Sequence, residues 1–69
     1  MNKLEVDNKV RVIDNSTWGY NKVGVLVAIV KDFIIDEEKR YRRNEYIVQF
    51  RNPAEWSWYI RRQLKKEPK

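Results

Sequence analysis

The chain has 69 residues, enough for one small domain, and its fifteen basic and ten acidic residues give a formal net charge of +5. It contains neither cysteine nor histidine, which excludes disulfide bonds and the usual zinc sites. A chain of this size buries only about 60% of its unfolded surface, so packing alone must stabilise its core. Three Trp, four Tyr and two Phe supply the bulk for that core.

The N-terminal part predicts one strand followed by a long loop. Asn8 to Ile13 alternates polar and apolar residues and places Val10 and Val12 on one face, which is typical of a half-buried strand. Residues 14–22 are rich in turn formers and have no strand period. We expect an ordered loop anchored by its aromatic residues.

Residues 23–30 form an apolar run that predicts a buried strand. Most of its residues are β-branched, and it contains Gly24, so a strand is favoured over a helix. Both faces of such a strand can be apolar where it bends sharply, and Gly24 allows the bend.

A hairpin is predicted between this strand and residues 45–50, where Tyr46, Val48 and Phe50 share a face. The polar residues 36–39 suit a four-residue turn closed by Ile35 and Arg40. That turn sets the register. It pairs Val25 with Phe50, Val27 with Val48, Ile29 with Tyr46, and Asp32 with Arg43, the last worth at most about 1 kcal/mol.

The C-terminal part predicts a fourth strand and a short helical turn. Asn52 and Pro53 indicate a turn, and residues 56–60 form a strand with Trp56, Trp58 and Ile60 on one face. Arg61 to Leu64 suits a single 3₁₀ turn, with Leu64 filling one end of the domain, and the basic tail 65–69 adds a short last strand or frays. Val27, Val48 and Trp58 are predicted to be buried.

The order of these segments resembles SH3-like barrels of the KOW and Tudor type. Val10-Arg11-Val12, a loop containing Gly19, and residues 23–27 resemble the pattern V-x-V…G-x-V-x-x-I. Residues 46–50, followed by tryptophans and Leu64, resemble the rest of it. The resemblance implies an all-β, five-stranded SH3-like barrel in one domain, 1–69, with its core at about 7–64.

In detail the chain is similar to small prophage-encoded proteins of Gram-positive bacteria. It departs from them where Asp7 and Asn8 replace a glycine before the first strand, and the hairpin from Lys31 to Asn44 is longer than usual. Because SH3-like folds bind RNA, DNA, peptides and ribosomes alike, the resemblance implies a fold and no single function.

Catalytic chemistry has few candidate groups in this sequence. Without His and Cys, the hydroxyl nucleophiles besides tyrosine are Ser16, Thr17 and Ser57, and no base stands at a recognisable spacing from them. Residues 36–38 are acidic but lack the spacing of an EF-hand loop, so a solvated turn is expected. We expect a non-enzymatic protein with no cofactor and no metal.

No apolar run approaches the roughly 20 residues of a membrane span. Residues 1–7 lack the apolar stretch of a signal peptide. A cytoplasmic protein that does not bind membranes is therefore expected.

Arginines interleaved with an aromatic residue predict a nucleic-acid-binding site, because guanidinium groups neutralise phosphates and aromatic rings stack on bases. The candidate residues are Arg40, Tyr41, Arg42, Arg43, Arg61 and Arg62. The alternative is a charged hairpin that its arginines keep soluble, partly paired with the acidic residues at 32 and 36–38.

A second candidate site is a peptide-binding groove. In SH3 relatives, aromatic residues of the first long loop and of the fourth strand form such a groove, and the corresponding residues here are Trp18, Tyr20, Trp56 and Tyr59. The alternative is that Trp18 and Trp56 cover the end of the barrel as part of its core.

A third basic cluster comprises Arg61, Arg62, Lys65, Lys66 and Lys69, which also fits a solvated chain end. The leading hypothesis is a nucleic-acid-associated accessory protein. Its alternative is a protein-interaction module that adapts or inhibits a phage or host protein, and Phe33, Ile34 and Ile35 leave self-association open.

Overall fold

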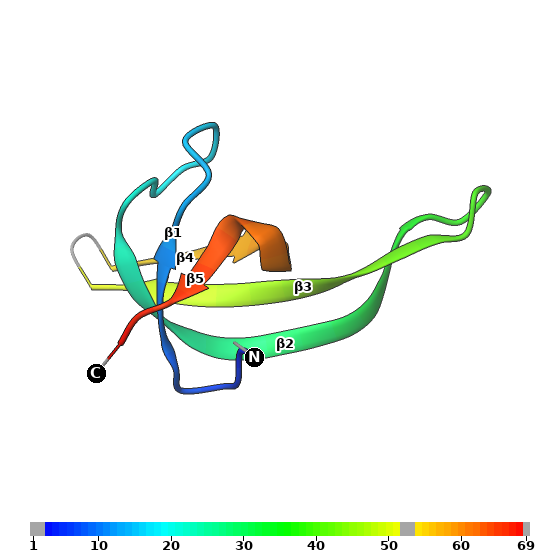
Figure 1. The fold of residues 1–69 in the computed structure, drawn as a ribbon. Coiled ribbons are helices and arrows are strands. Elements are labelled where there is room, and N and C mark those ends of the chain that lie inside the picture. Colours follow the sequence, from blue (N-terminus) through cyan, green and yellow to red (C-terminus); the bar gives the residue numbers. More distant parts are fainter. Residues whose placement is uncertain (1–2, 52–53, 69) are drawn as a thin grey trace.

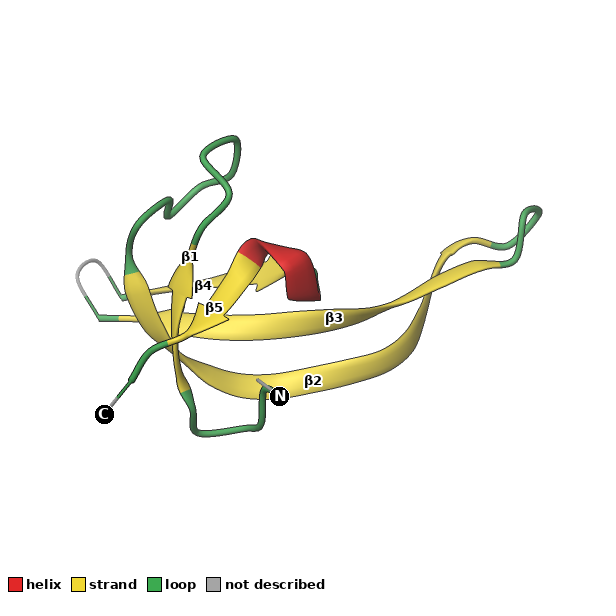
Figure 2. Cartoon of the chain, in the orientation of Figure 1, coloured by secondary structure: helices red, strands yellow, loops and turns green. Residues whose placement is uncertain are grey.

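The computed structural model describes residues 3–51 and 54–68 and contains five strands and one short helical turn (Figures 1 and 2). In chain order these are β1 (Lys9–Val12), β2 (Val23–Asp36), β3 (Tyr41–Phe50), β4 (Glu55–Tyr59), the 3₁₀ turn η1 (Arg61–Gln63) and β5 (Leu64–Lys66). The strands form one antiparallel sheet in the order β4-β3-β2-β1-β5. The predicted all-β class is confirmed, with β4 and β5 as the two edges of an open sheet.

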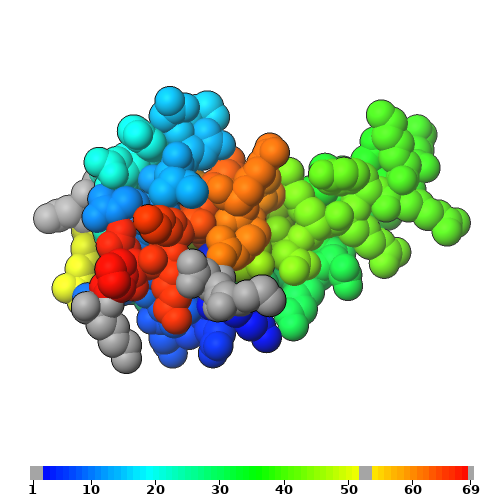
Figure 3. Space-filling model, viewed as in Figure 1, coloured from blue at the N-terminus to red at the C-terminus, as the bar shows by residue number. Residues whose placement is uncertain are grey.

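The hairpin of β2 and β3 projects from the rest of the molecule (Figures 1 and 3). The sequence predicted a long hairpin closed by Ile35 and Arg40, and pairing does continue outward, to Asp36 and Tyr41. The molecule is consequently elongated, with extents of 39 × 26 × 19 Å. No described helix, in residues 3–51 or 54–68, has the length and apolar character needed to cross a membrane.

The hydrophobic core lies on one face of the curled sheet. Its members are Leu4, Val10, Val12, Leu26, Tyr46, Val48, Phe50, Tyr59 and Leu64. The predicted inward faces of the first and third strands are confirmed, and so is the burial of Val48 and Leu64.

The predicted register of β2 against β3 is correct at Ile29, which pairs with Tyr46, and wrong towards the core end. There Leu26 pairs with Val48, and Val27 is the extra residue of a bulge. Val27 is 38% exposed, so its predicted burial is wrong. The cause is the bulge, which moves the alternation by one residue and points Leu26 inward in its place.

The same slip affects Val25, which was predicted to face Phe50 and instead pairs with Gln49. Gly24, directly before it, is buried and allows a close approach of the strands. A Cβ atom there would lie 2.6 Å from Cγ1 of Val48 and 2.7 Å from the carbonyl oxygen of Gln49.

The hairpin turn lies one residue later than predicted. Asp36 pairs with Tyr41, so residues 37–40 make the turn. Oδ1 of Asp36 accepts hydrogen bonds from the backbone N–H groups of Glu38 (3.0 Å) and Lys39 (3.3 Å), as an aspartate at a turn start commonly does. Arg40 ends the turn with a φ of 52°.

The predicted pair of Asp32 and Arg43 is wrong, because β2 has a second irregularity between Val30 and Phe33. Arg43 pairs with Phe33, whereas Asp32 has a φ of 55° and its backbone N–H donates to Oδ1 of Asn44 at 3.1 Å. Aspartate tolerates this left-handed conformation better than most residues.

Strand β4 presents the opposite face to the core from the one predicted. Ser57 pairs with Val48 and therefore faces inward with it, while Trp58 pairs with Ile47 and faces outward. Trp58 is 54% exposed, so its predicted burial is wrong, and Tyr59 is buried in its place. The predicted turn at Asn52 and Pro53 lies outside the described residues.

Candidate functional site

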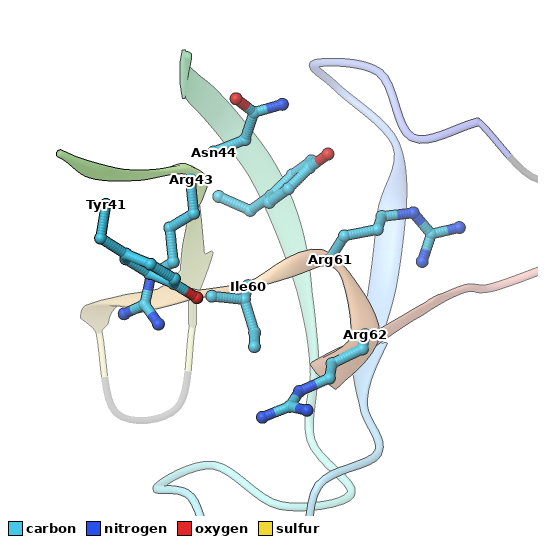
Figure 4. A pocket seen from close by; sticks show the side chains of 7 residues that line it. Tyr41, Arg43, Asn44, Ile60, Arg61 and Arg62 are labelled. Atoms are coloured by element: carbon cyan, nitrogen blue, oxygen red, sulfur yellow. The ribbon is translucent and has the colours of Figure 1, made fainter. Parts of the chain in front are cut away.

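A shallow groove of about 450 Å³ lies where the base of the projecting hairpin meets η1 (Figure 4). Its lining residues are Tyr41, Arg43, Asn44, Tyr46, Ile60, Arg61 and Arg62. We call it the arginine groove. It brings together four of the six residues predicted to bind nucleic acid, two from β3 and two from η1.

The end of β4 explains why these segments meet. The last β4 residue, Tyr59, pairs with Tyr46, so β3 continues past it without a β4 partner. At Ile60 the chain turns into η1: its backbone N–H donates to Oε1 of Gln63 (2.9 Å), and the Gln63 N–H donates to the Ile60 carbonyl (3.0 Å). This tight turn sets Arg61 and Arg62 beside the exposed part of β3.

A buried carboxylate orients Arg43 in the groove. The Nε–H group of Arg43 donates to Oε1 of Glu45 at 2.8 Å, and Glu45 is only 6% exposed. That bond uses one of the five N–H donors of the guanidinium group. The other four N–H groups can donate to a second acceptor, such as a phosphate.

The two arginines of η1 differ in their surroundings. Nη1 of Arg61 donates to the carbonyl of Leu64 at 3.0 Å, and in Figure 4 the side chain extends away from Tyr41 and Arg43. Arg62 is exposed. Tyr41 and Arg43 come down beside Ile60 (Figure 4), so the groove has an aromatic ring and a cation on one wall.

Asp14 ties the β1–β2 loop to η1. Its carboxylate accepts hydrogen bonds from the hydroxyl (2.6 Å) and backbone N–H (2.9 Å) of Ser16, and from Nε2 of Gln63 (3.0 Å). The side-chain bond from Ser16, then that from Gln63, and to a smaller extent the positive charge of Arg62, lower the pKa of Asp14 to about 2. The loop therefore braces the turn that carries the groove arginines.

The other two predicted nucleic-acid residues lie outside the groove. Arg40 is in the turn at the tip of the hairpin, and Arg42 pairs with Ile34 on the face opposite to Arg43. In the C-terminal cluster, Lys65 and Lys66 are exposed on β5, at the other edge of the sheet, and Lys69 is outside the described residues.

The four predicted peptide-binding residues do not form one groove. Tyr59 is buried, its hydroxyl donates to the carbonyl of Trp18 at 2.5 Å, and burial raises the pKa of Tyr59. Trp18 packs edge-on against the inward-facing Phe50, with ring centroids 5.3 Å apart. Tyr20 is exposed in the loop, whereas Trp56 is exposed on the outward face of β4.

Sequence reasoning missed a contact between Phe33 on β2 and Trp58 on β4, whose ring centroids are 6.1 Å apart. Trp58 was predicted to be buried, on a face shared with Trp56 and Ile60. A signal for the true arrangement was available in Ser57, whose small side chain suits the space against Val48 better than either neighbouring tryptophan would.

Comparisons with protein-family models, curated proteins and solved structures found no match. Within residues 3–51 and 54–68, no group of three or more His, Cys, Asp or Glu side chains is placed to hold a metal ion. The function must therefore be inferred from the chemistry of the residues themselves.

Proposed function

We propose that the chain is an SH3-like barrel. The strand order, the long β2 that pairs with β1 at its start and with β3 further on, and the 3₁₀ turn between β4 and β5 support this assignment. Because β4 and β5 do not pair with each other among the described residues, such a barrel would be incompletely closed.

We further propose a non-enzymatic, cytoplasmic module that binds nucleic acid weakly and without sequence preference. The observation that supports it most is the arginine groove, where Tyr41 and Arg43 of β3 lie beside Arg61 and Arg62 of η1. Guanidinium groups form paired hydrogen bonds with phosphate oxygens, and a base can stack on a neighbouring aromatic ring. The net charge of +5 adds a general attraction to polyanions.

The salt dependence of binding tests this function. Phosphate contacts at Arg43 and Arg62 predict a slope near −1.4 for single strands when log K is plotted against log salt concentration. The measurement is a titration of fluorescent oligonucleotides from low to moderate salt. Binding that is absent at about 100 μM protein and low ionic strength would refute the proposal, because electrostatic affinity is greatest there.

A matched pair of variants tests the location. Arg62→Ser and Lys65→Ser each remove one exposed positive charge, the first in the arginine groove and the second on β5. We expect Arg62→Ser to reduce the slope by about 0.7 and Lys65→Ser to change it much less. Equal effects would mean that net charge, and not this groove, determines binding.

The second candidate function is a protein-interaction module for a phage or host protein. The observation that favours it is the exposure of Trp18, Tyr20 and Trp56, each about half exposed or more. This function predicts that substitution of these three aromatic residues abolishes partner capture and that salt has little effect. Tyr59 is buried, so it would act by holding Trp18 in place.

A further inference from the structure

Besides Tyr41 of the arginine groove, three large aromatic side chains are exposed on the outward face of the sheet. They are Trp56 and Trp58 of β4, which are 68% and 54% exposed, and Phe33 of β2, which is 42% exposed. We call them the aromatic platform. Phe33 and Trp58 meet at a centroid distance of 6.1 Å with their rings tilted by 54°.

The aromatic platform shares one face of the sheet with Arg43 and Ile60, which line one side of the arginine groove. Phe33 pairs directly with Arg43, so the two side chains share a face. Along β4 and its continuation, Trp56, Trp58 and Ile60 alternate onto the same side, and Ile60 already lines the groove. A ligand that contacts Arg43 and Ile60 can therefore continue over Trp58 to Trp56 on the same face of the sheet.

The charge along this face indicates the kind of ligand. Rings exposed to this degree favour a partner that covers them, and Arg43 and Arg62 at one end favour an anionic one. A second copy of the chain also carries a net charge of +5, so overall charge repulsion opposes self-association. A ligand with flat apolar rings and regularly spaced negative charges matches both features.

We propose that this face binds single-stranded nucleic acid, with phosphates at Arg43 and Arg62 and successive bases stacked on Trp58 and Trp56. The inference rests on the proposed nucleic-acid function and adds a preference for single-stranded over duplex nucleic acid. Residues i and i+2 of a strand are about 6.6 Å apart. Bases in a duplex follow each other at about 3.4 Å, so two bases can use both tryptophans only when they are unstacked, which a duplex prevents.

Binding of one oligonucleotide sequence, as a single strand and as a duplex, tests the inference at fixed low salt. The variants are Trp58→Ala, Trp58→Leu and, as a matched exposed aromatic away from the platform, Tyr20→Ala. Stacking on Trp58 predicts a loss of about 5- to 150-fold in single-strand affinity for both Trp58 variants. We expect unchanged duplex affinity for both, and no effect of Tyr20→Ala. Quenching of tryptophan fluorescence by the single strand, lost in part with Trp58, is the second readout.

The Leu variant keeps apolar bulk and removes the flat ring, so full affinity of Trp58→Leu would overturn stacking. Equal affinity of the native protein for single strand and duplex would also overturn the inference, while the nucleic-acid function would survive. Failure to bind either form at low salt would overturn both. A dimer in sedimentation experiments that Trp58→Ala dissociates would assign the face to a second copy and overturn the inference as well.

Discussion

The hydroxyl of Tyr59 connects two distant parts of the chain, and its removal should loosen the β1–β2 loop. It donates to the carbonyl of Trp18 at 2.5 Å. The next residue, Gly19, has a φ of +83°, and a Cβ atom there would lie 2.8 Å from the Tyr59 hydroxyl oxygen. Substitutions at the two sites should therefore affect stability jointly.

The expected magnitudes follow from these contacts. Tyr59→Phe removes one hydrogen bond and should lower the free energy of unfolding by about 1 kcal/mol. Gly19→Ala should cost about 1–2 kcal/mol for the left-handed backbone, and more for the contact with the hydroxyl. In the double variant the hydroxyl is absent, so the new Cβ at position 19 no longer clashes with it. The double variant should therefore lose less free energy of unfolding than the sum of the two single losses, by at least about 0.5 kcal/mol.

Urea unfolding followed by tryptophan fluorescence measures all four proteins. Tyr20→Phe is the control, because Tyr20 is exposed in the same loop and should change the free energy of unfolding by less than about 0.5 kcal/mol. Strictly additive costs of Tyr59→Phe and Gly19→Ala would show that the hydroxyl does not occupy the space beside Gly19.

Three further outcomes are expected. Gly24→Ala should prevent stable folding or lower the unfolding midpoint severely, because its Cβ would meet backbone as well as side-chain atoms; a native-like midpoint would contradict this. Val48→Ala should cost about 1–3 kcal/mol in urea unfolding, whereas Val27→Ala should cost less than about 0.5; the reverse order would restore the register predicted from the sequence. Because the pKa of Asp14 falls from 3.8 to about 2 on folding, its contribution is full above about pH 4 and is lost as the pH falls to 2. The difference in stability between the native protein and Asp14→Asn should shrink over that range, and a constant difference would be evidence against the bonds to Ser16 and Gln63.

The sequence predicted the fold class and the inward face of β3 because the alternation there is clear. Tyr46, Val48 and Phe50 are separated by residues that are less buried. In β2 the run is apolar at almost every position, so periodicity cannot reveal that Val27 forms a bulge. A single extra residue then exchanged the faces of Leu26 and Val27.

The prediction for β4 chose the wrong face. Alternation groups Trp56, Trp58 and Ile60 on one face, but it does not tell which face of the strand points inward. The register with β3 decided otherwise, and Tyr59 also satisfies its hydroxyl inside the fold. For the candidate site, arginines interleaved with Tyr41 predicted six residues, of which Tyr41, Arg43, Arg61 and Arg62 line the groove. These residues meet because β4 ends at Tyr59, opposite Tyr46, and leaves the first residues of β3 without a β4 partner. Local sequence patterns do not encode this difference in strand length.

The uneven pairing of the projecting hairpin has a consequence for solubility. Beyond the core, the paired residues of β2 come in short runs, 28–30, then 33–34, then Asp36, separated by irregularities. Among the described residues, only the start of β2 also pairs with β1, so the outer length of the strand presents a free edge. A long regular edge is a template on which another chain can add a strand and begin to aggregate. Here the interruptions leave only short stretches of regular edge, and the charged residues that dominate positions 31–44 oppose the addition of another strand.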